Sequence, residues 1–155
     1  MTAIFAATSL ATSVANELND KFAYNYAVDE RNQVTEKVVY KADGKYLEHH
    51  LKYAYAYDEA GRVVRKEAYK WNDVKQAYQP YYCLTYAYDA EGVALEYALW
   101  NDEAGAYTDA RQRAEYDLTP AGVNYQAYAW DHQQNGWQLQ TEHAVMSTAN
   151  LFAIR

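Results

Sequence analysis

The sequence predicts an all-β fold, an antiparallel meander of about nine strands built from hairpin repeats of about thirty residues. Tryptophans recur at Trp71, Trp100 and Trp130, 29 and 30 residues apart. Turn motifs that begin with aspartate recur between them. Residues 51–57, with the sequence LKYAYAY, alternate with a period of two, which is typical of a strand and not of an amphipathic helix. A chain of 155 residues is long enough to form one domain with its own core.

Nine alternating segments lie between the turn motifs. They span residues 21–28, 33–40, 46–57, 62–71, 77–88, 93–100, 107–116, 123–130 and 137–146. Because all connections are short, neighbours in sequence should pair antiparallel. We expect an open sheet, twisted or partly curled around its tyrosine-rich face. A closed barrel, which would remove the exposed edges, is the alternative. Residues 147–155 are predicted to be a tail or a tenth strand.

The connections between these segments are of two kinds. Tight turns have Asp at the first position and Gly or Asn at the fourth, which suits a type I turn followed by a left-handed residue. They are Asp29–Asn32, Asp58–Gly61 and Asp89–Gly92, with a longer variant from Asp117 through Pro120 to Gly122. The opposite connections are polar and variable, and we expect longer loops there. They are residues 41–45, 72–77, 101–106 and 131–136.

The tight turns also predict which side chains share a face. If Asp58 pairs with Arg62, Tyr55 faces Arg65, and the same rule places Tyr86 beside Glu96 in the next hairpin. One face would then collect tyrosines, tryptophans and an acidic column, and the other face would be small and mixed. The acidic column consists of Glu36, Glu67, Glu96 and Gln126, each four residues before an aromatic residue.

Each repeated tryptophan is followed by an amide or a carboxylate. The candidate ligand-binding residues are therefore Trp71, Asn72, Trp100, Asn101, Trp130 and Asp131. On alternate strands the tryptophans would lie about 9.6 Å apart, twice the strand spacing, and form a row of flat rings. Such rows with polar neighbours stack sugar rings or contact partner proteins. Cross-strand aromatic pairs that stabilise the sheet are the alternative explanation.

The first fifteen residues are predicted to be a signal peptide. They carry no charge, and Ser13 and Ala15 flank Val14 as at an A-x-A-type cleavage site, so we expect a cut between Ala15 and Asn16. The basic start of a signal peptide is missing, which leaves a truncated signal or an ordinary N-terminal helix open. We expect residues 16–155 to form a single β-repeat domain that is secreted or periplasmic, at the cell envelope. No other segment approaches the length of a membrane span.

The charge distribution argues against nucleic acid and membranes as partners. Residues 78–155 hold three Lys and Arg against ten Asp and Glu, a difference of −7 that equals the formal net charge of the chain. Neither a basic patch for nucleic acid nor a membrane-inserting segment is predicted. The possible partners that remain are a glycan or an envelope protein.

The residue inventory predicts no catalytic site, cofactor or metal. Cys83 is the sole cysteine, so no intramolecular disulfide forms, and it is predicted to be a small buried residue on a strand. The four histidines lack zinc-site spacing, and neither a phosphate loop nor a dinucleotide fingerprint is present. Paired carboxylates hydrolyse glycosides, but the acidic column is matched by Gln126 and repeats with the sheet, which favours structural hydrogen-bond acceptors.

Two resemblances follow from these motifs. The segments 57–63 (YDEAGRV) and 88–92 (YDAEG) resemble the YD repeats of Rhs-type wall and toxin-shell proteins, which form β-hairpin strips. With the added Trp-Asn step, residues 21–146 are more similar to a family of small exported bacterial proteins known only as a domain of unknown function. That resemblance implies export and carries no catalytic residues. We therefore expect a non-enzymatic binding module first, a purely structural or assembly role second and a glycoside-acting enzyme last.

Overall fold

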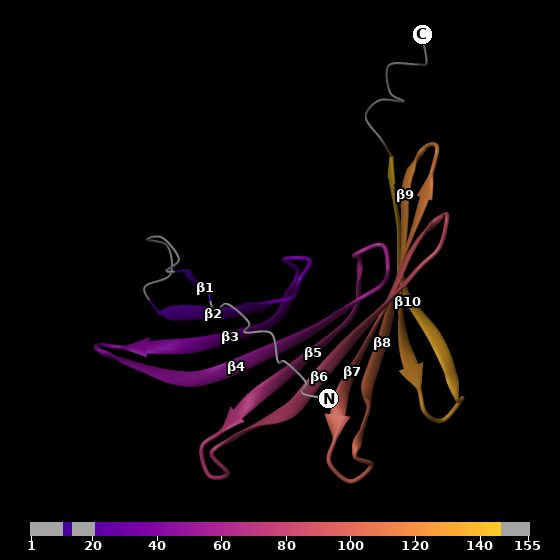
Figure 1. The fold of residues 1–155 in the computed structure, drawn as a ribbon. Coiled ribbons are helices and arrows are strands. Elements are labelled where there is room, and N and C mark those ends of the chain that lie inside the picture. Colours follow the sequence, from indigo (N-terminus) through magenta and orange to yellow (C-terminus); the bar gives the residue numbers. More distant parts are fainter. Residues whose placement is uncertain (1–10, 14–20, 147–155) are drawn as a thin grey trace, which may run out of the picture. The chain divides into compact units, whose positions relative to one another are not determined.

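The computed structural model describes residues 11–13 and 21–146, which form ten β-strands (Figure 1). The strands are β1 (Ala11–Ser13), β2 (Phe22–Val28), β3 (Val34–Asp43), β4 (Tyr46–Tyr57), β5 (Val63–Asn72), β6 (Ala77–Tyr88), β7 (Gly92–Asn101), β8 (Ala106–Thr119), β9 (Gly122–Asp131) and β10 (Gly136–Met146). β2 to β10 correspond to the nine predicted segments. The predicted all-β fold is therefore confirmed.

The strand order in the sheet follows the chain from β1 to β10. Because β1 and β10 are the two ends of this order, the described strands form an open meander, and the closed-barrel alternative is wrong. The chain divides into two compact units, Met1–Tyr81 and Tyr82–Arg155, which are described separately below. Within the predicted signal peptide only β1 is described. The rest of that segment, the predicted cut after Ala15 and residues 147–155 lie outside the described residues.

Two of the tight turns have the predicted conformation. The backbone N–H of Asp29 donates to the carbonyl of Gln33, and the N–H of Asp58 donates to that of Arg62, each at 2.9 Å. The fourth turn residues are left-handed, with φ of 60° at Asn32 and 80° at Gly61. Asparagine and glycine are the residues that adopt this conformation at least cost.

The other connections are shorter than predicted. Thr119 pairs with Gly122 across a two-residue turn, so the long variant expected around Pro120 is wrong. The connections that follow the tryptophans are four-residue turns, at residues 73–76, 102–105 and 132–135. Each ends in a left-handed residue, Gln76, Gly105 or Asn135, with φ between 49° and 60°. Two of these turns could not be recognised from the sequence, because glutamine or asparagine stands at the left-handed position where glycine usually marks a turn.

The predicted register is wrong by one residue in both hairpins. Tyr57 pairs with Val63 as expected, but a β-bulge follows and places Tyr55 opposite Lys66 rather than Arg65. In the next hairpin, β6 and β7 pair Tyr86 with Leu95 rather than with Glu96, because Asp89 already pairs with Gly92. A slip of one residue moves every later side chain to the opposite face of the sheet.

In the first unit this slip separates Tyr53 and Tyr55 of β4 from Trp71. On one face lysine ammonium groups lie over tyrosine rings, with Lys37 Nζ 4.3 Å from the Tyr24 centroid and Lys66 Nζ 4.3 Å from that of Tyr53. This tyrosine face comprises Tyr24, Tyr26, Lys37, Val39, Tyr53, Tyr55, Lys66 and Ala68. The opposite, tryptophan face comprises Glu36, Tyr40, Lys52, Glu67, Tyr69 and Trp71. The prediction that Tyr53 and Tyr55 share a face with Trp71 and the acidic column is therefore wrong.

Few side chains are buried. Among the described residues the buried apolar side chains are Val39, Ala68 and Cys83. Cys83 lies on β6 with 4% of its surface exposed, in agreement with its predicted place on a strand. Most strand residues are half-buried, which suits a tyrosine-rich sheet, because a tyrosine ring packs on the sheet while its hydroxyl stays in contact with water.

Candidate functional site

The three repeated tryptophans share one packing arrangement. Each is half-buried and meets, edge to face, the aromatic residue seven positions later. The ring centroids lie 5.0 Å apart in Trp71–Tyr78, 5.0 Å in Trp100–Tyr107 and 5.2 Å in Trp130–Trp137, with interplanar angles of 70° to 79°. T-shaped contacts of this kind are favourable for aromatic rings. The repeat seen in the sequence is therefore a repeat of three-dimensional structure.

The polar residue after each tryptophan stabilises the turn that follows. Asn72 Oδ1 accepts from the Lys75 N–H at 2.9 Å, and Asn101 Oδ1 accepts from the Ala104 N–H at 2.7 Å. At the third position, Asp131 Oδ1 accepts from the N–H groups of residues 133 and 134 at 2.7 and 3.1 Å. Side chains of this type commonly close turns. The candidate residues Asn72, Asn101 and Asp131 thus have a structural role in the hairpin turns.

Trp71 lies where two hairpins separate. The pairing of β4 with β5 extends to Leu51 and Lys70, whereas β4 continues to pair with β3 as far as Tyr46. Beyond this point the β3–β4 tip and the β5–β6 tip point in different directions (Figure 1). We call this opening the fork. His49 of β4 stacks on Trp71 in the fork, with ring centroids 4.3 Å apart and 21° between the planes.

Trp130 has an equivalent neighbour in the second unit. The pairing of β8 with β9 extends to Gln112 and Ala129, next to the tryptophan. Beside that pair, the guanidinium carbon of Arg111 lies 4.5 Å from the ring centroid of Trp130 and 5.0 Å from that of Trp137. A cation over an indole ring is a favourable contact that also holds the ring in one orientation.

Surface hollows adjoin Trp71 and Trp130, and they are lined from equivalent positions of the repeat. The hollow beside Trp71 has a volume of about 420 Å³, and the hollow beside Trp130 has one of about 410 Å³. The other residues that line the second hollow are Ala129, Asp131, His132, Gln133, Gln138 and Gln140. The residues 59 positions earlier line the first, namely Lys70, Asn72, Asp73, Val74, Gln79 and Tyr81. The same repeat position therefore forms a tryptophan-lined hollow in two repeats.

A family model described as a family of unknown function, DUF3836, matches residues 1–117 of the chain. The chain belongs to the DUF3836 family. The predicted resemblance to a family of unknown function is thereby confirmed, whereas the resemblance to YD repeats stays a prediction. A search of the curated proteins finds no match.

Solved structures of bacterial proteins have a similar fold. A protein of unknown function from Bacteroides fragilis is 20% identical, with 82% of this chain and 94% of that chain covered and a TM-score of 0.72. A DUF3836 protein from Parabacteroides distasonis is 23% identical, with 62% and 89% covered and a TM-score of 0.56. A DUF3836 protein from Bacteroides vulgatus is 25% identical, with 68% and 98% covered and a TM-score of 0.54. The first two likenesses are informative about the fold alone.

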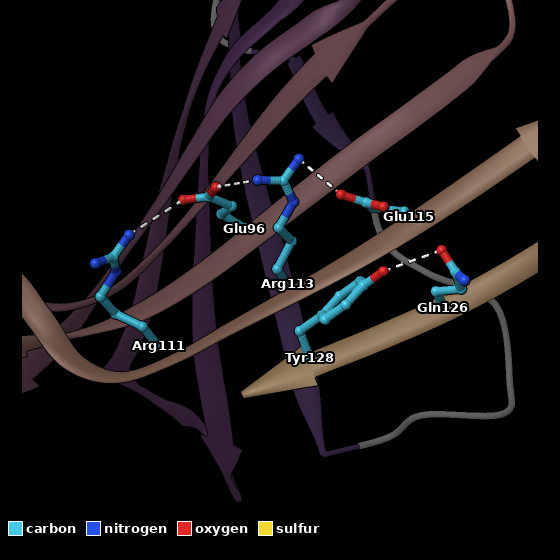
Figure 2. Close-up of polar contacts among 6 residues, drawn as sticks. All are labelled: Glu96, Arg111, Arg113, Glu115, Gln126 and Tyr128. Carbon is cyan, nitrogen blue, oxygen red and sulfur yellow. Dashed lines mark hydrogen bonds and ion pairs between the residues drawn. The ribbon is translucent and has the colours of Figure 1, made fainter. Parts of the chain in front are cut away.

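The acidic column of this DUF3836 protein is occupied by ion pairs and hydrogen bonds. Figure 2 shows Glu96 between Arg111 and Arg113, at 3.6 and 3.5 Å, with Arg113 continuing to Glu115 at 2.7 Å. In the first unit Glu36 pairs with Lys52 at 3.6 Å, and Glu67 pairs with Arg65 at 3.0 Å. Gln126 accepts from the Tyr128 hydroxyl at 3.0 Å and donates to Glu142 at 2.8 Å. These contacts are those of structural acceptors.

The fork also contains groups with shifted pKa values. Burial, with additional effects of Tyr40 and Glu36, raises the pKa of Tyr78 to about 12. Its hydroxyl lies 2.9 Å from Nδ1 of His49. On the other side of the fork, burial and the positive charges of Lys41 and Lys70 lower the pKa of His50.

The sequence did not reveal the neighbours of the tryptophans. His49 is exposed, but its stacking on Trp71 was not anticipated, and neither was the contact of Arg111 with Trp130. Their place in the chain could have indicated this role, because each lies on the strand that precedes the strand of its tryptophan. The described residues include no cluster of three His, Cys, Asp or Glu side chains that could hold a metal ion. Within the same residues we find no helix with the length and apolarity needed to cross a membrane.

Proposed function

We propose that this DUF3836 protein is a non-enzymatic binding module of the cell envelope that holds glycan chains in the hollows beside Trp71 and Trp130. The observation that supports this proposal is the correspondence of the two hollows, since every residue that lines the second has a counterpart 59 positions earlier that lines the first. A repeated protein surface suits a ligand that is itself a chain of similar units.

The chemistry of the hollows suits a sugar ring. A sugar presents an apolar face that packs on an indole and a rim of hydroxyls that needs donors and acceptors. Gln79 and Gln138 supply an amide at the same position of the two hollows. His49 and Arg111 fix the orientation of the indoles, and a fixed ring loses less conformational entropy when a ligand binds.

Export is part of the proposal. The uncharged segment 1–15 and the Ser-Val-Ala sequence before Asn16 favour a secreted or periplasmic protein, which would meet envelope glycans. N-terminal sequencing of the exported protein from its native type of host tests this part. Asn16 as the first residue is the expected result, and Met1 at the N-terminus of the exported pool would contradict it.

A purely structural or assembly role is the second candidate. The oxygens of Asn72, Asn101 and Asp131 close turns, and each tryptophan packs on a neighbouring ring, which a structural column would also require. An envelope protein as the bound partner is a variant of the first proposal. A glycoside-acting enzyme ranks last, because the carboxylates of the acidic column are held in ion pairs.

A glycan array with the full chain and three variants tests the proposed function. Trp71→Ala and Trp130→Ala should each weaken the signal of the glycans that bind the wild type. Tyr116→Ala is the matched control, because Tyr116 is 39% exposed, contacts one ring at 5.0 Å and lines neither hollow. Glycan binding that survives both tryptophan variants, or an array without any bound glycan, would contradict the proposal.

A further inference from the structure

The fork holds a second and larger hollow on the other side of Trp71. It has a volume of about 640 Å³ and lies where β4 separates from β5. Its lining residues are Lys41, Leu47, Glu48, His49, His50, Lys70, Trp71, Asp73 and Gln76. Trp71, Lys70 and Asp73 also line the smaller hollow, so a ligand held against the indole can reach both spaces.

Lys41 and Lys70 line this hollow and, among the described residues, lack the ion pairs that several other cationic side chains form. Arg65, Arg111 and Lys52 form ion pairs with the acidic column. Lys41 and Lys70 form no ion pair within the part of the chain that the structure describes. Both side chains belong to exposed residues, one near the end of β3 and one near the end of β5.

His50 lines the same hollow as these two lysines. Its imidazole stacks on Phe22, with centroids 5.9 Å apart, and it is half-buried. Burial is the largest cause of its lowered pKa, and Lys41 and Lys70 are the charges that add to it. Glu48 and Asp73 also line the hollow, but the charges that act on the imidazole are those of the two lysines. A positive, partly desolvated position attracts an anion.

We infer that the fork binds the carboxylate of an acidic sugar, with the sugar ring against Trp71 and the carboxylate between Lys41, Lys70 and His50. This inference rests on the proposed glycan binding and names the class of glycan that the first unit accepts. The hollow beside Trp130 has Ala129 in place of Lys70 and a lining of glutamines, so the second unit should accept neutral sugars. The two units would then differ in specificity.

Pairs of ligands that differ only in charge test the inference. Each member of a panel of uronate-containing oligosaccharides is titrated into the full chain beside its carboxyl-reduced form. The acidic member should bind about tenfold more tightly, the usual contribution of a charge-assisted hydrogen bond. Lys41→Gln and Lys70→Gln should remove that preference. Lys75→Gln is the matched control, since Lys75 is exposed on the adjacent turn and does not line the hollow.

Nuclear magnetic resonance of His50 gives a second readout. Because an anion favours the imidazolium, binding of the acidic sugar should raise the pKa of His50, and the reduced sugar should leave it unchanged. Equal affinity for acidic and reduced sugars, or a preference that persists in Lys41→Gln and Lys70→Gln, would overturn the inference. Tryptophan-dependent binding of neutral glycans in the same titrations would keep the proposed function intact. The absence of any glycan binding by the wild type would contradict both the inference and the proposed function.

Discussion

The Nδ1 atom of His49 and the hydroxyl oxygen of Tyr78 lie 2.9 Å apart, and both rings pack against Trp71. The imidazole covers a face of the indole, whereas Tyr78 meets it edge to face. Because the hydrogen bond links β4 to β6, it ties together the strands on either side of β5. These contacts therefore fix the orientation of the indole.

The hydroxyl of Tyr78 makes stability depend on pH in the alkaline range. Its pKa is raised to about 12, above the value of about 10 for an unfolded tyrosine. The folded state therefore binds more protons than the unfolded state, and this contribution to stability is lost as pH rises from about 10 to about 12. Urea unfolding midpoints of the wild type should fall more steeply over this range than those of Tyr78→Phe. Parallel curves would contradict the burial of this hydroxyl.

Asn72 tests the structural role of the residues that follow the tryptophans. Asn72→Ala removes the acceptor of the Lys75 N–H and the donor to Gln79 Oε1, and should cost about 1 to 3 kcal/mol of stability, the net worth of two hydrogen bonds. Asn72→Asp should lose less, because its carboxylate keeps the acceptor, as Asp131 does in the third repeat. Denaturant unfolding of both variants provides the measurement. Equal losses in the two variants would show that the acceptor oxygen is not what matters.

Gly92 and Gly105 are both turn glycines, but for different reasons. A Cβ atom on Gly92 would lie 1.8 Å from the carbonyl oxygen of Tyr116 in the neighbouring strand. Gly105 has open space around it and a φ of +60°. Gly92→Ala should therefore cost about 1 to 3 kcal/mol or more, because two backbones must move apart. Gly105→Asn should be nearly neutral, because asparagine tolerates this φ. Thermal unfolding that ranks the two variants in the opposite order would refute this distinction.

The strands could be predicted from the sequence because the two-residue alternation and the Asp-x-x-Gly motifs are local signals. The register could not, because it depends on a bulge between the pairs Tyr57–Val63 and Ala56–Arg65 and on the early closure of the turn at Asp89. Both are shifts of a single residue. Gly92 also lies close to the Tyr116 carbonyl oxygen in the adjacent strand. These two residues are 24 positions apart in the sequence, so no local motif contains their contact.

A substitution at Glu96 tests whether the acidic column has a structural or a catalytic role. Glu96→Gln weakens two partly exposed ion pairs, with Arg111 and Arg113, and should change stability by less than about 1 kcal/mol. Gln126 already occupies the equivalent position in the last repeat. The affinity for any glycan found on the array should also be unchanged. Hydrolysis of that glycan by the wild type, abolished in Glu96→Gln, would instead assign the column to catalysis.

Part of the candidate site could also be predicted from the sequence. The spacing of the tryptophans located the hollows beside Trp71 and Trp130, because a repeat in sequence becomes a repeat in space. His49 and Arg111 were missed because they lie about 20 residues before their tryptophans, on the preceding strand. The turn-closing role of Asn72 was missed because its connection was expected to be a longer loop.

The most direct test of the account is the affinity and the stability of the tryptophan variants, measured side by side. With a glycan identified on the array, Trp71→Ala and Trp130→Ala should each lose about 1 kcal/mol or more of binding free energy, as anchor aromatics do. Their unfolding free energies should fall by less than the about 3 to 5 kcal/mol lost when a fully buried aromatic is truncated, because these indoles are half-buried. Trp100→Ala completes the set as the middle repeat. Unchanged affinity in the variants, or a loss of stability as large as that of a core residue, would contradict the account and leave the tryptophans as structural residues.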